Sequence, residues 1–294
     1  MNNILNTLEV EEYVSDVHQA FQEQGNRFMD PNVCRLRRIT GAKSAHFPKM
    51  GKLRATRRVI GTPIVTSNAS AADVEISVTE YTVGCYTDIF LQSEVNFDAR
   101  QEDVTAMALA CGRKVDQVAI DALAAGTYVA NVNQVSAIQN GGGTTDGMRF
   151  TGIVLSAKLL DRVTNMQGTN RSLVAFTDDL HHMVAADQAA VASSDYVNNK
   201  TNQNGLGNNL YKFNFIPIGA MDDEDGLPLN TGTDVVSNYA FLRPALGLVV
   251  NMEPNIRVDW DTQMGAYLAA AFLSVGSKII DNTGIVELLT DQSP

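Results

Sequence analysis

Five carboxylates in the first half of the chain are of the side-chain type that acid–base catalysis requires: Asp88, Asp98, Asp103, Asp116 and Asp121. Asp98 stands where a helical pattern begins and is better explained as its N-cap. Asp116 and Asp121 fit charges on the polar face or at the end of that helix. No Ser, His and Asp, and no Cys and His, are spaced as a nucleophile and its base would be. We therefore expect no catalytic residues and no enzyme activity.

Three other groups have residue types that could hold a metal ion or a phosphate. His181 and His182 are adjacent, so they do not share a helix face, and no third His or Cys lies at ligand spacing. The acidic run 222–225 lacks the alternation and the terminal Glu of an EF-hand loop. Residues 141–143 are three glycines without the preceding strand and following Lys of a phosphate loop. We expect solvated or capping histidines, an exposed acidic loop, and neither metal nor cofactor.

The strongest chemical signal is a basic segment, residues 35–58, with nine Lys or Arg and no acid in a chain of net charge −11. Residues 1–34 hold one basic and six acidic residues, and residues 59–294 hold 12 basic and 27 acidic ones. A basic arm on an acidic body can pair with a copy of itself, so we interpret the segment as an assembly device. Phosphate binding is the alternative. The candidate intersubunit residues are Arg35, Arg37, Arg38, Lys43, Phe47, Lys49, Lys52, Arg54, Arg57 and Arg58.

Length and composition limit the class of protein. A chain of 294 residues suits one large or two smaller domains with a substantial core. Cys34, Cys85 and Cys111 are odd in number and far apart, which indicates reduced thiols and intracellular assembly. No secretion signal is evident, and the apolar stretch 266–273 is too short to span a bilayer. We expect a soluble protein that does not enter a membrane.

The elements around the basic segment follow from periodicity. Val10, Val14, Val17 and Phe21 recur at helical spacing before Gly25, which predicts a short amphipathic helix. The runs KSAHFP and LRATRRVI predict two strands joined through residues 49–52, where Pro48 and Gly51 suit a turn. Two-stranded ribbons are marginal in water, so this hairpin must lie on another surface.

A strand and a long helix follow the hairpin. Alternation predicts a strand from Asp73 with a bulge or break near Thr79 and Glu80; its inward residues are Val74, Ile76 and Val78 and then Tyr81, Val83 and Cys85. Asp98 and Gln101 resemble a capping box, and Gly126 marks a helix end. The apolar stripe between them is Val104, Met107, Cys111, Val115, Val118 and Ala122. The helix 98–125 would be roughly 40 Å long.

The rest of the chain mixes helices and strands. Residues 131–151 predict a loop, followed by a helix at 156–167, a strand at 173–176, a helix from 177, and a strand at 211–218. Alternation over 257–264 predicts that Val258, Trp260 and Met264 are buried. Residues 266–280 form an apolar run that turns at 281–284 into a last strand, 285–289, and these strands should pack on the helix 98–125. The predicted class is α+β.

This order of parts resembles the major capsid protein of tailed bacteriophages, the Hong Kong 97-type shell fold, in its podovirus branch. The run SAHFPKMG beside DVEISV resembles the start of that family's extended E-loop. The segment DARQEDVTAMALACGRKVDQVAIDALAAG is similar to its spine helix, and WDTQMGAYLAAAFLSVGSKIIDNTGIVELL is similar to its C-terminal peripheral strands. The resemblance covers most of the chain.

The resemblance implies five parts: an N-terminal arm (1–37), an E-loop hairpin (38–78), a first peripheral part with the spine helix (79–130), an axial domain (131–244) and a second peripheral part (245–294). It implies a self-assembling icosahedral shell of hexamers and pentamers that encloses a double-stranded DNA genome, held non-specifically. A separate scaffolding protein, a portal protein and, as an option, a cement protein would be partners. The chain would reside in the virion capsid after assembly in the host cytoplasm, without a covalent crosslink.

The physical hypothesis is that the basic hairpin of one subunit lies across the acidic peripheral part of its neighbour. The apolar hairpin residues Phe47, Pro48, Leu53, Val59 and Ile60 would supply the desolvated contacts. Three alternatives stay open: a nanocompartment shell of the same fold that encloses protein cargo, a nucleic-acid-binding protein that uses residues 35–58, and an enzyme whose site has no recognisable motif.

Overall fold

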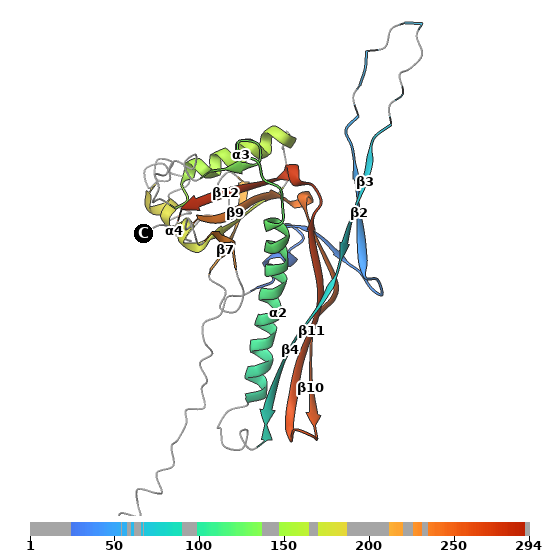
Figure 1. Ribbon diagram of the computed structural model, residues 1–294, viewed down its shortest axis with the longest axis vertical. Coiled ribbons are helices and arrows are strands. Elements are labelled where there is room, and N and C mark those ends of the chain that lie inside the picture. The colour runs from blue at the N-terminus through green and yellow to red at the C-terminus, as the bar shows by residue number, and fades with distance from the viewer. Residues whose placement is uncertain are drawn as a thin grey trace, which may run out of the picture.

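The computed structural model describes residues 25–53, 55–57, 60–61, 66, 68–89, 99–136, 147–164, 170–186, 212–219, 226–230 and 235–291. Figure 1 shows an elongated molecule with a long body made of one helix and a narrow sheet, a wider part at one end of that body, and a hairpin that projects beyond it. The predicted N-terminal helix and the loops at 141–143 and 222–225 lie outside the described residues.

Helices and strands are mixed along the chain, which confirms the predicted α+β class. Their order is η2 (Arg27–Met29), β1 (Arg35–Arg38), β2 (Ser44–Met50), β3 (Ala71–Ser77), β4 (Thr79–Asp88), α2 (Ala99–Ala124), β5 (Gln134–Val135), α3 (Phe150–Thr164), β6 (Arg171–Phe176), α4 (Thr177–Ala186), β7 (Phe213–Ile218), β8 (Leu229–Asn230), β9 (Val235–Leu242), η4 (Arg243–Ala245), β10 (Leu246–Asp261), β11 (Ala266–Ile279), η5 (Asn282–Gly284) and β12 (Ile285–Asp291).

The body is a four-stranded sheet in the order β1-β10-β11-β4, with α2 packed along one face. The helix spans 26 residues, which confirms the predicted helix 98–125 to within a residue at each end. Ala269, Ala271 and Leu273 of β11 are buried in the same core as Met107 and Cys111 of α2. The predicted break between β3 and β4 falls at Val78, one residue before its expected place.

Asp116 of α2 is buried and holds the start of the described chain, so its prediction as a polar-face charge is wrong. Its two carboxylate oxygens accept hydrogen bonds from the backbone N–H groups of Arg27 and Phe28, each at 3.2 Å. The backbone N–H of Asn26 donates to the carbonyl of Gly112 at 3.2 Å. Residues 25–34 are therefore fixed against the middle of the spine helix.

The wider part is a six-stranded sheet in the order β5-β12-β9-β6-β7, with β8 beside β9. α3 packs against β12, and α4 packs against β6 and β7. β12 pairs with β9 from Ile285↔Phe241 to Asp291↔Val235. The prediction that the last strand packs with β10 and β11 on the long helix is therefore wrong, because the turn at η5 carries the chain into the other sheet.

The predicted strands at 173–176 and 211–218 and the helix from 177 are confirmed as β6, β7 and α4. α3 begins at Phe150, six residues before the predicted start. The Gly-rich composition of residues 131–151 predicted a loop up to this point. Gly152 nevertheless lies in the first turn of α3, where its carbonyl accepts a hydrogen bond from the Ser156 hydroxyl at 2.8 Å. Among the helices of the described residues, none is both long and apolar enough to cross a bilayer.

Candidate assembly interface

The hairpin is formed by β2 and β3, which pair antiparallel from Ser44↔Ser77 to Met50↔Ala71. The predicted pairing of KSAHFP with LRATRRVI is therefore wrong, because the second strand lies about twenty residues further along the chain. Pro48 does not end β2, since a two-stranded ribbon has open edges where a missing N–H costs no ladder bond. The described residues between the two strands lie at the far end of the hairpin (Figure 1).

The base of the hairpin sits on the face of the four-stranded sheet opposite α2. Ala45, Phe47 and Ile76 of the hairpin form a small apolar cluster with Val249 of β10 and Ile280 after β11. Phe47 is only 2% exposed within its own chain. This cluster is the surface that the marginal stability of an isolated ribbon requires.

Four of the candidate intersubunit residues bind groups of their own chain at this base. The Arg35 guanidinium lies 5.1 Å from the centre of the Phe47 ring. The other contacts are Arg37 Nη1 to His46 O at 2.9 Å, Arg38 Nε to Glu253 Oε1 at 2.7 Å, and Lys49 Nζ to Asp281 Oδ1 at 2.9 Å. The two ion pairs are substantially exposed, so each contributes at most about 1 kcal/mol and mainly orients the hairpin.

Asp281 shows the electrostatic effect of this contact. Burial acts to raise the pKa of the Asp281 carboxyl, but hydrogen bonds from Lys49 and Thr283 outweigh burial and hold that pKa below its ordinary value. A carboxyl with a depressed pKa stabilises the folded state above its unfolded pKa and loses that contribution as pH falls through the folded pKa. The Lys49 contact therefore persists at neutral pH.

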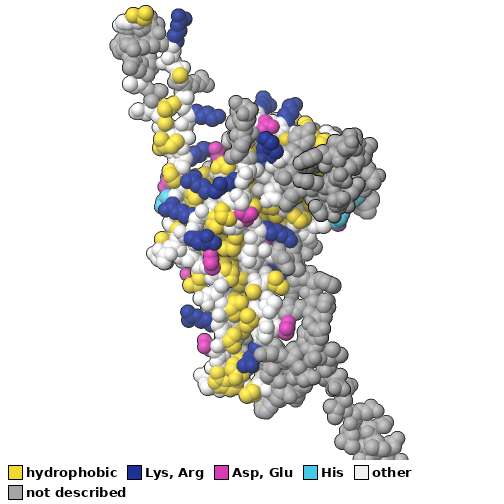
Figure 2. Space-filling model, turned by 180° about the vertical axis from the view of Figure 1, so that it is seen from behind, with side chains coloured by type: hydrophobic (Ala, Val, Ile, Leu, Met, Phe, Trp, Pro, Cys, Tyr) yellow, Lys and Arg dark blue, Asp and Glu magenta, His cyan; other side chains and the backbone are white. Residues whose placement is uncertain are grey.

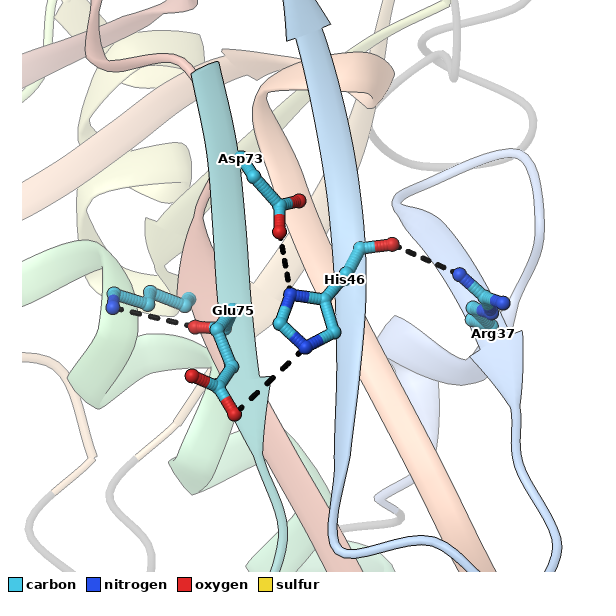
Figure 3. Close-up of polar contacts among 5 residues, drawn as sticks. Arg37, His46, Asp73 and Glu75 are labelled. Atoms are coloured by element: carbon cyan, nitrogen blue, oxygen red, sulfur yellow. Dashed lines mark hydrogen bonds and ion pairs between the residues drawn. The ribbon is translucent and has the colours of Figure 1, made fainter.

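His46 lies between two carboxylates of the paired strand (Figure 3). Its Nδ1 is 2.5 Å from Asp73 Oδ2, and its Nε2 is 4.0 Å from Glu75 Oε1. The backbone carbonyl of Glu75 accepts a hydrogen bond from Lys278 Nζ at 3.3 Å. The side chains of His46, Asp73 and Glu75 bridge the two strands near the base. The two carboxylates face opposite nitrogens of the His46 ring, so the three side chains do not converge on one point as metal ligands would.

The distal hairpin residues have the exposure that an assembly contact requires. Met50, Leu53 and Ile60 are 70%, 61% and 99% exposed. Lys52 and Arg57 are also exposed, whereas Lys43, though exposed, lies at the base, where its carbonyl accepts a hydrogen bond from the Val78 N–H at 3.0 Å. Arg54, Arg58 and Val59 lie outside the described residues. The structure thus divides the candidate residues into a set bound at the base and a set free of the body along the projecting part.

The tip of the body carries exposed apolar side chains, which corrects one prediction. Val258, Trp260 and Met264 are 42%, 43% and 64% exposed, so their predicted burial is wrong for the single chain. β10 is paired on only one side over most of its length, because β1 reaches only Gly247–Val250. The Trp260 and Tyr267 rings pack edge to face with centroids 4.9 Å apart.

The sheet face opposite α2, which we call the strand face, has an apolar centre and one acidic end. Its cross-strand rows are Asp261, Ala266 and Asp88; Asp259, Leu268 and Tyr86; Arg257, Ala270 and Gly84; and Asn255, Phe272 and Thr82. Tyr86 and Phe272 are 50% and 39% exposed. Figure 2 shows apolar side chains in a stripe along the body between charged ones. This pattern is complementary to a basic segment that carries apolar residues.

The residues considered for catalysis or metal binding do not converge. Asp103 accepts a hydrogen bond from Thr87 Oγ1 at 2.8 Å, and Asp121 accepts one from Gln117 Nε2 at 2.8 Å. His181 and His182 are both exposed. In the described part of the chain, no three His, Cys, Asp or Glu residues are grouped as metal ligands would be. These positions are explained by local structure.

The three cysteines carry free thiols, two of them buried. Burial raises the pKa of the Cys34 thiol to about 12, and the thiol donates to the Phe28 carbonyl at 2.8 Å. Burial also raises the pKa of the Cys111 thiol and of the Cys85 thiol, which is partly exposed. Because the thiolate is the reactive form, all three should react slowly.

We expect Cys85 to react first with a thiol reagent at pH 8 and Cys34 to react at least about tenfold more slowly, since its thiolate fraction is lower. Mass spectrometry of the alkylated chain at timed intervals measures both rates. Full denaturation is the control and should make the rates equal. Equal rates in the folded chain would contradict the burial of Cys34.

An elongated body, a projecting hairpin and two exposed apolar surfaces define a structural protein that completes its surfaces by packing against other chains. A model of the phage capsid protein family matches residues 5–292. The chain therefore belongs to the phage capsid protein family. It is a major capsid protein, a structural protein that forms the shell of the virion, as the resemblance implied.

Solved capsid structures share the fold at low sequence identity. The head of Helicobacter pylori bacteriophage KHP40 gives a TM-score of 0.74 at 11% identity and covers 99% of both chains. The capsid of Ralstonia phage GP4 gives 0.71 at 12% identity, covering 98% of this chain and 96% of that one. The capsid of cyanophage P-SCSP1u gives 0.67 at 16% identity, covering 98% and 95%. No curated protein matches the chain.

Proposed function

We propose that the distal hairpin of one subunit lies on the strand face of a neighbouring subunit in the shell. The observation that carries this proposal is the match between exposed apolar and basic residues on the hairpin and an apolar stripe with an acidic end on the strand face. Ile60, almost fully exposed, and Leu53 supply apolar area, while Lys52 and Arg57 supply charge.

Burial and repetition supply the affinity in this arrangement, and charge supplies the register. Exposed ion pairs contribute about 0–1 kcal/mol each, too little for a stable interface. Fully burying an Ile or Leu side chain contributes about 1.5–3 kcal/mol, and every subunit of a closed shell makes the contact twice, once as donor and once as acceptor. Complementary charge excludes wrong registers of the hairpin on the strand face.

Charge reversal of the distal hairpin is expected to abolish normal shells. In a variant with Arg54→Glu, Arg57→Glu and Arg58→Glu, like charges meet the acidic end of the strand face, so the assembled fraction should fall at least about tenfold. Sedimentation and electron microscopy measure this fraction.

The control for charge reversal is Lys158→Glu with Arg162→Glu on the exposed side of α3. Adding Asp259→Lys and Asp261→Lys to the reversed hairpin should restore assembly, because the complementary charges are exchanged. Normal shells at normal yield in the hairpin variant would refute the proposed contact.

The same packing explains the exposed tip. The alternation of Val258 and Trp260 with charged residues is typical of a strand with one buried face, although both side chains are exposed in the single chain. We propose that neighbouring chains cover this tip in the shell. Burial of Trp260 on assembly should shift its fluorescence emission to shorter wavelength, and Trp260 is the chain's single tryptophan.

We further propose the finer architecture that the resemblance implies. The shell would be icosahedral, built of hexamers and pentamers around the double-stranded DNA of a tailed phage, and assembled in the host cytoplasm with scaffolding and portal proteins and, as an option, a cement protein. We propose the same arm, E-loop, peripheral and axial divisions, except that the pairing of β12 with β9 supports placing residues 285–291 with the axial part.

A further inference from the structure

Two glycines lie under the base of the hairpin, on the strand face. Gly247 belongs to β10 and Gly276 to β11, and the register places Val249 opposite Gly276. Val249 is buried in the small apolar cluster with Phe47 and Ile76. The hairpin base therefore rests on a part of the sheet that lacks two side chains, and we call Gly247, Val249, Gly276 and Ile280 the hairpin seat.

Gly276 allows the chain to leave the sheet. A Cβ at this position would lie 2.0 Å from the Ser77 carbonyl oxygen, 2.9 Å from the Ser77 carbonyl carbon and 3.1 Å from Val78 Cα. The chain leaves β3 at Ser77, crosses over β11 at Gly276, and then pairs with β11 as β4 from Thr79↔Val275 onward. All three nearest atoms belong to backbone, so no side-chain rotation could relieve the clash.

Gly247 accommodates the hairpin in a different way. A Cβ at this position would lie 2.7 Å from Ile76 Cδ1 and 3.0 Å from Ile280 Cδ1. Ile76 is 1% exposed and thus packs directly onto the backbone of β10. A methyl group here would push on the hairpin through one side chain instead of through its backbone.

We propose that Gly247 and Gly276 are positioning residues that set the angle at which the hairpin leaves the body, and thereby the geometry of the shell. The ion pairs Arg38–Glu253 and Lys49–Asp281 flank the seat, but both are exposed, and exposed ion pairs fix their geometry only weakly. The close-packed seat has no such freedom, because interiors respond to the addition of a single methyl group. The angle is therefore set by contact at the seat.

The direct test is a distance between the hairpin and the body in the unassembled full-length chain. Spin labels at Met50→Cys and Val129→Cys, two exposed positions, report this distance in a Cys85→Ser background. In Gly276→Ala, relieving the 2.0 Å contact requires a shift of roughly 1.5 Å at the seat, and any tilt of the hairpin enlarges this shift over the roughly 20 Å from the seat to Met50, so the label distance should change by at least about 1.5 Å.

Two further variants keep the test informative if Gly276→Ala does not fold. Gly247→Ala should change the label distance by a smaller amount. Adding Ile76→Val removes the Cδ1 methyl of the hairpin that the new Cβ would meet and leaves only the contacts with Ile280 of the body, so Gly247→Ala with Ile76→Val should bring the distance back toward the original value. Gly84→Ala is the matched control, because its Cβ would meet no atom closer than 3.6 Å.

Particle geometry is the second readout, and it rests on the proposed contact between the hairpin and a neighbour. Gly276→Ala should give shells of altered or mixed diameter in electron micrographs. In the label measurement on the unassembled chain, the Gly84→Ala control should keep the original distance. An unchanged label distance in folded Gly276→Ala, or failure of Ile76→Val to restore Gly247→Ala, would overturn the positioning role. A changed distance with normal shells would overturn only the link to shell geometry.

Discussion

Asp179→Ala is expected to lower the free energy of unfolding by about 3–5 kcal/mol, since it leaves several buried donors without an acceptor. Asp179 is fully buried in the first turn of α4. Its carboxylate accepts hydrogen bonds from Asn238 Nδ2 at 2.7 Å, Thr290 Oγ1 at 2.6 Å and the Met148 backbone N–H at 3.1 Å. One side chain therefore connects α4 to β9, β12 and the chain before α3.

The neighbouring residue provides a matched control for this network. Asp178 lies in the same first turn of α4 but is exposed, so Asp178→Ala should remove only a favourable helix-terminus charge, worth about 0.3–1 kcal/mol. Urea denaturation of both unassembled variants, followed by circular dichroism, measures the two losses. Equal losses would mean that the Asp179 hydrogen bonds contribute little.

Elements with a strong period and a clear end were predictable from the sequence. The long helix has an apolar stripe whose buried residues share one core with β11, and its bounds agree with the prediction to within a residue. The strands on either side of the turn at η5 were also predicted, because a continuous apolar run and a turn signal coincide there. The partner of the last strand was not predictable, because strand pairing depends on the path of the whole chain.

The hairpin shows how a local signal can mislead. Pro48 and Gly51 are turn-forming residues, so the predicted turn was placed beside them. In the structure Gly51 donates its N–H to the Ser70 carbonyl at 2.6 Å, and the ribbon continues beyond Pro48 because its outer edge has no partner strand in the described chain. The prediction counted Pro48 as a break and so paired the wrong strand.

The candidate site was predictable as a segment but not residue by residue. A run of basic residues identified the hairpin, whereas the division between Arg38 or Lys49, which bind acids of their own chain, and Arg57, which is exposed, depends on where Glu253 and Asp281 fold. Those acids are more than 200 positions away from their partners. No local pattern in a sequence contains that information.

The attachment of residues 25–34 to the spine helix could not be predicted from the sequence either. It depends on the close approach of Gly25 to Gly112 and on the buried Asp116, and both of these helix positions are far from residues 25–34 in sequence. A Cβ on Gly25 would lie 2.0 Å from the Gly112 carbonyl carbon and 2.3 Å from the Arg113 nitrogen. This close approach brings Phe28 into the core, where its ring stacks on Phe241 with centroids 6.2 Å apart and planes within 10°. The arm, the helix and the six-stranded sheet meet at this point.

Gly25→Ala is therefore expected to detach this arm from α2 and to lower the free energy of unfolding by about 3–5 kcal/mol, the range for losing a buried Phe. The nearest atoms are all backbone, so the new methyl can be accommodated only by moving the arm away from the helix. Hydrogen exchange at the Phe28 amide, which donates to Asp116, should accelerate, and trypsin should cleave after Arg27. Gly84→Ala, the same change at a roomy site, should leave both readouts unchanged. Protection of the Phe28 amide that survives in Gly25→Ala would show that the arm is held by contacts other than this crossing.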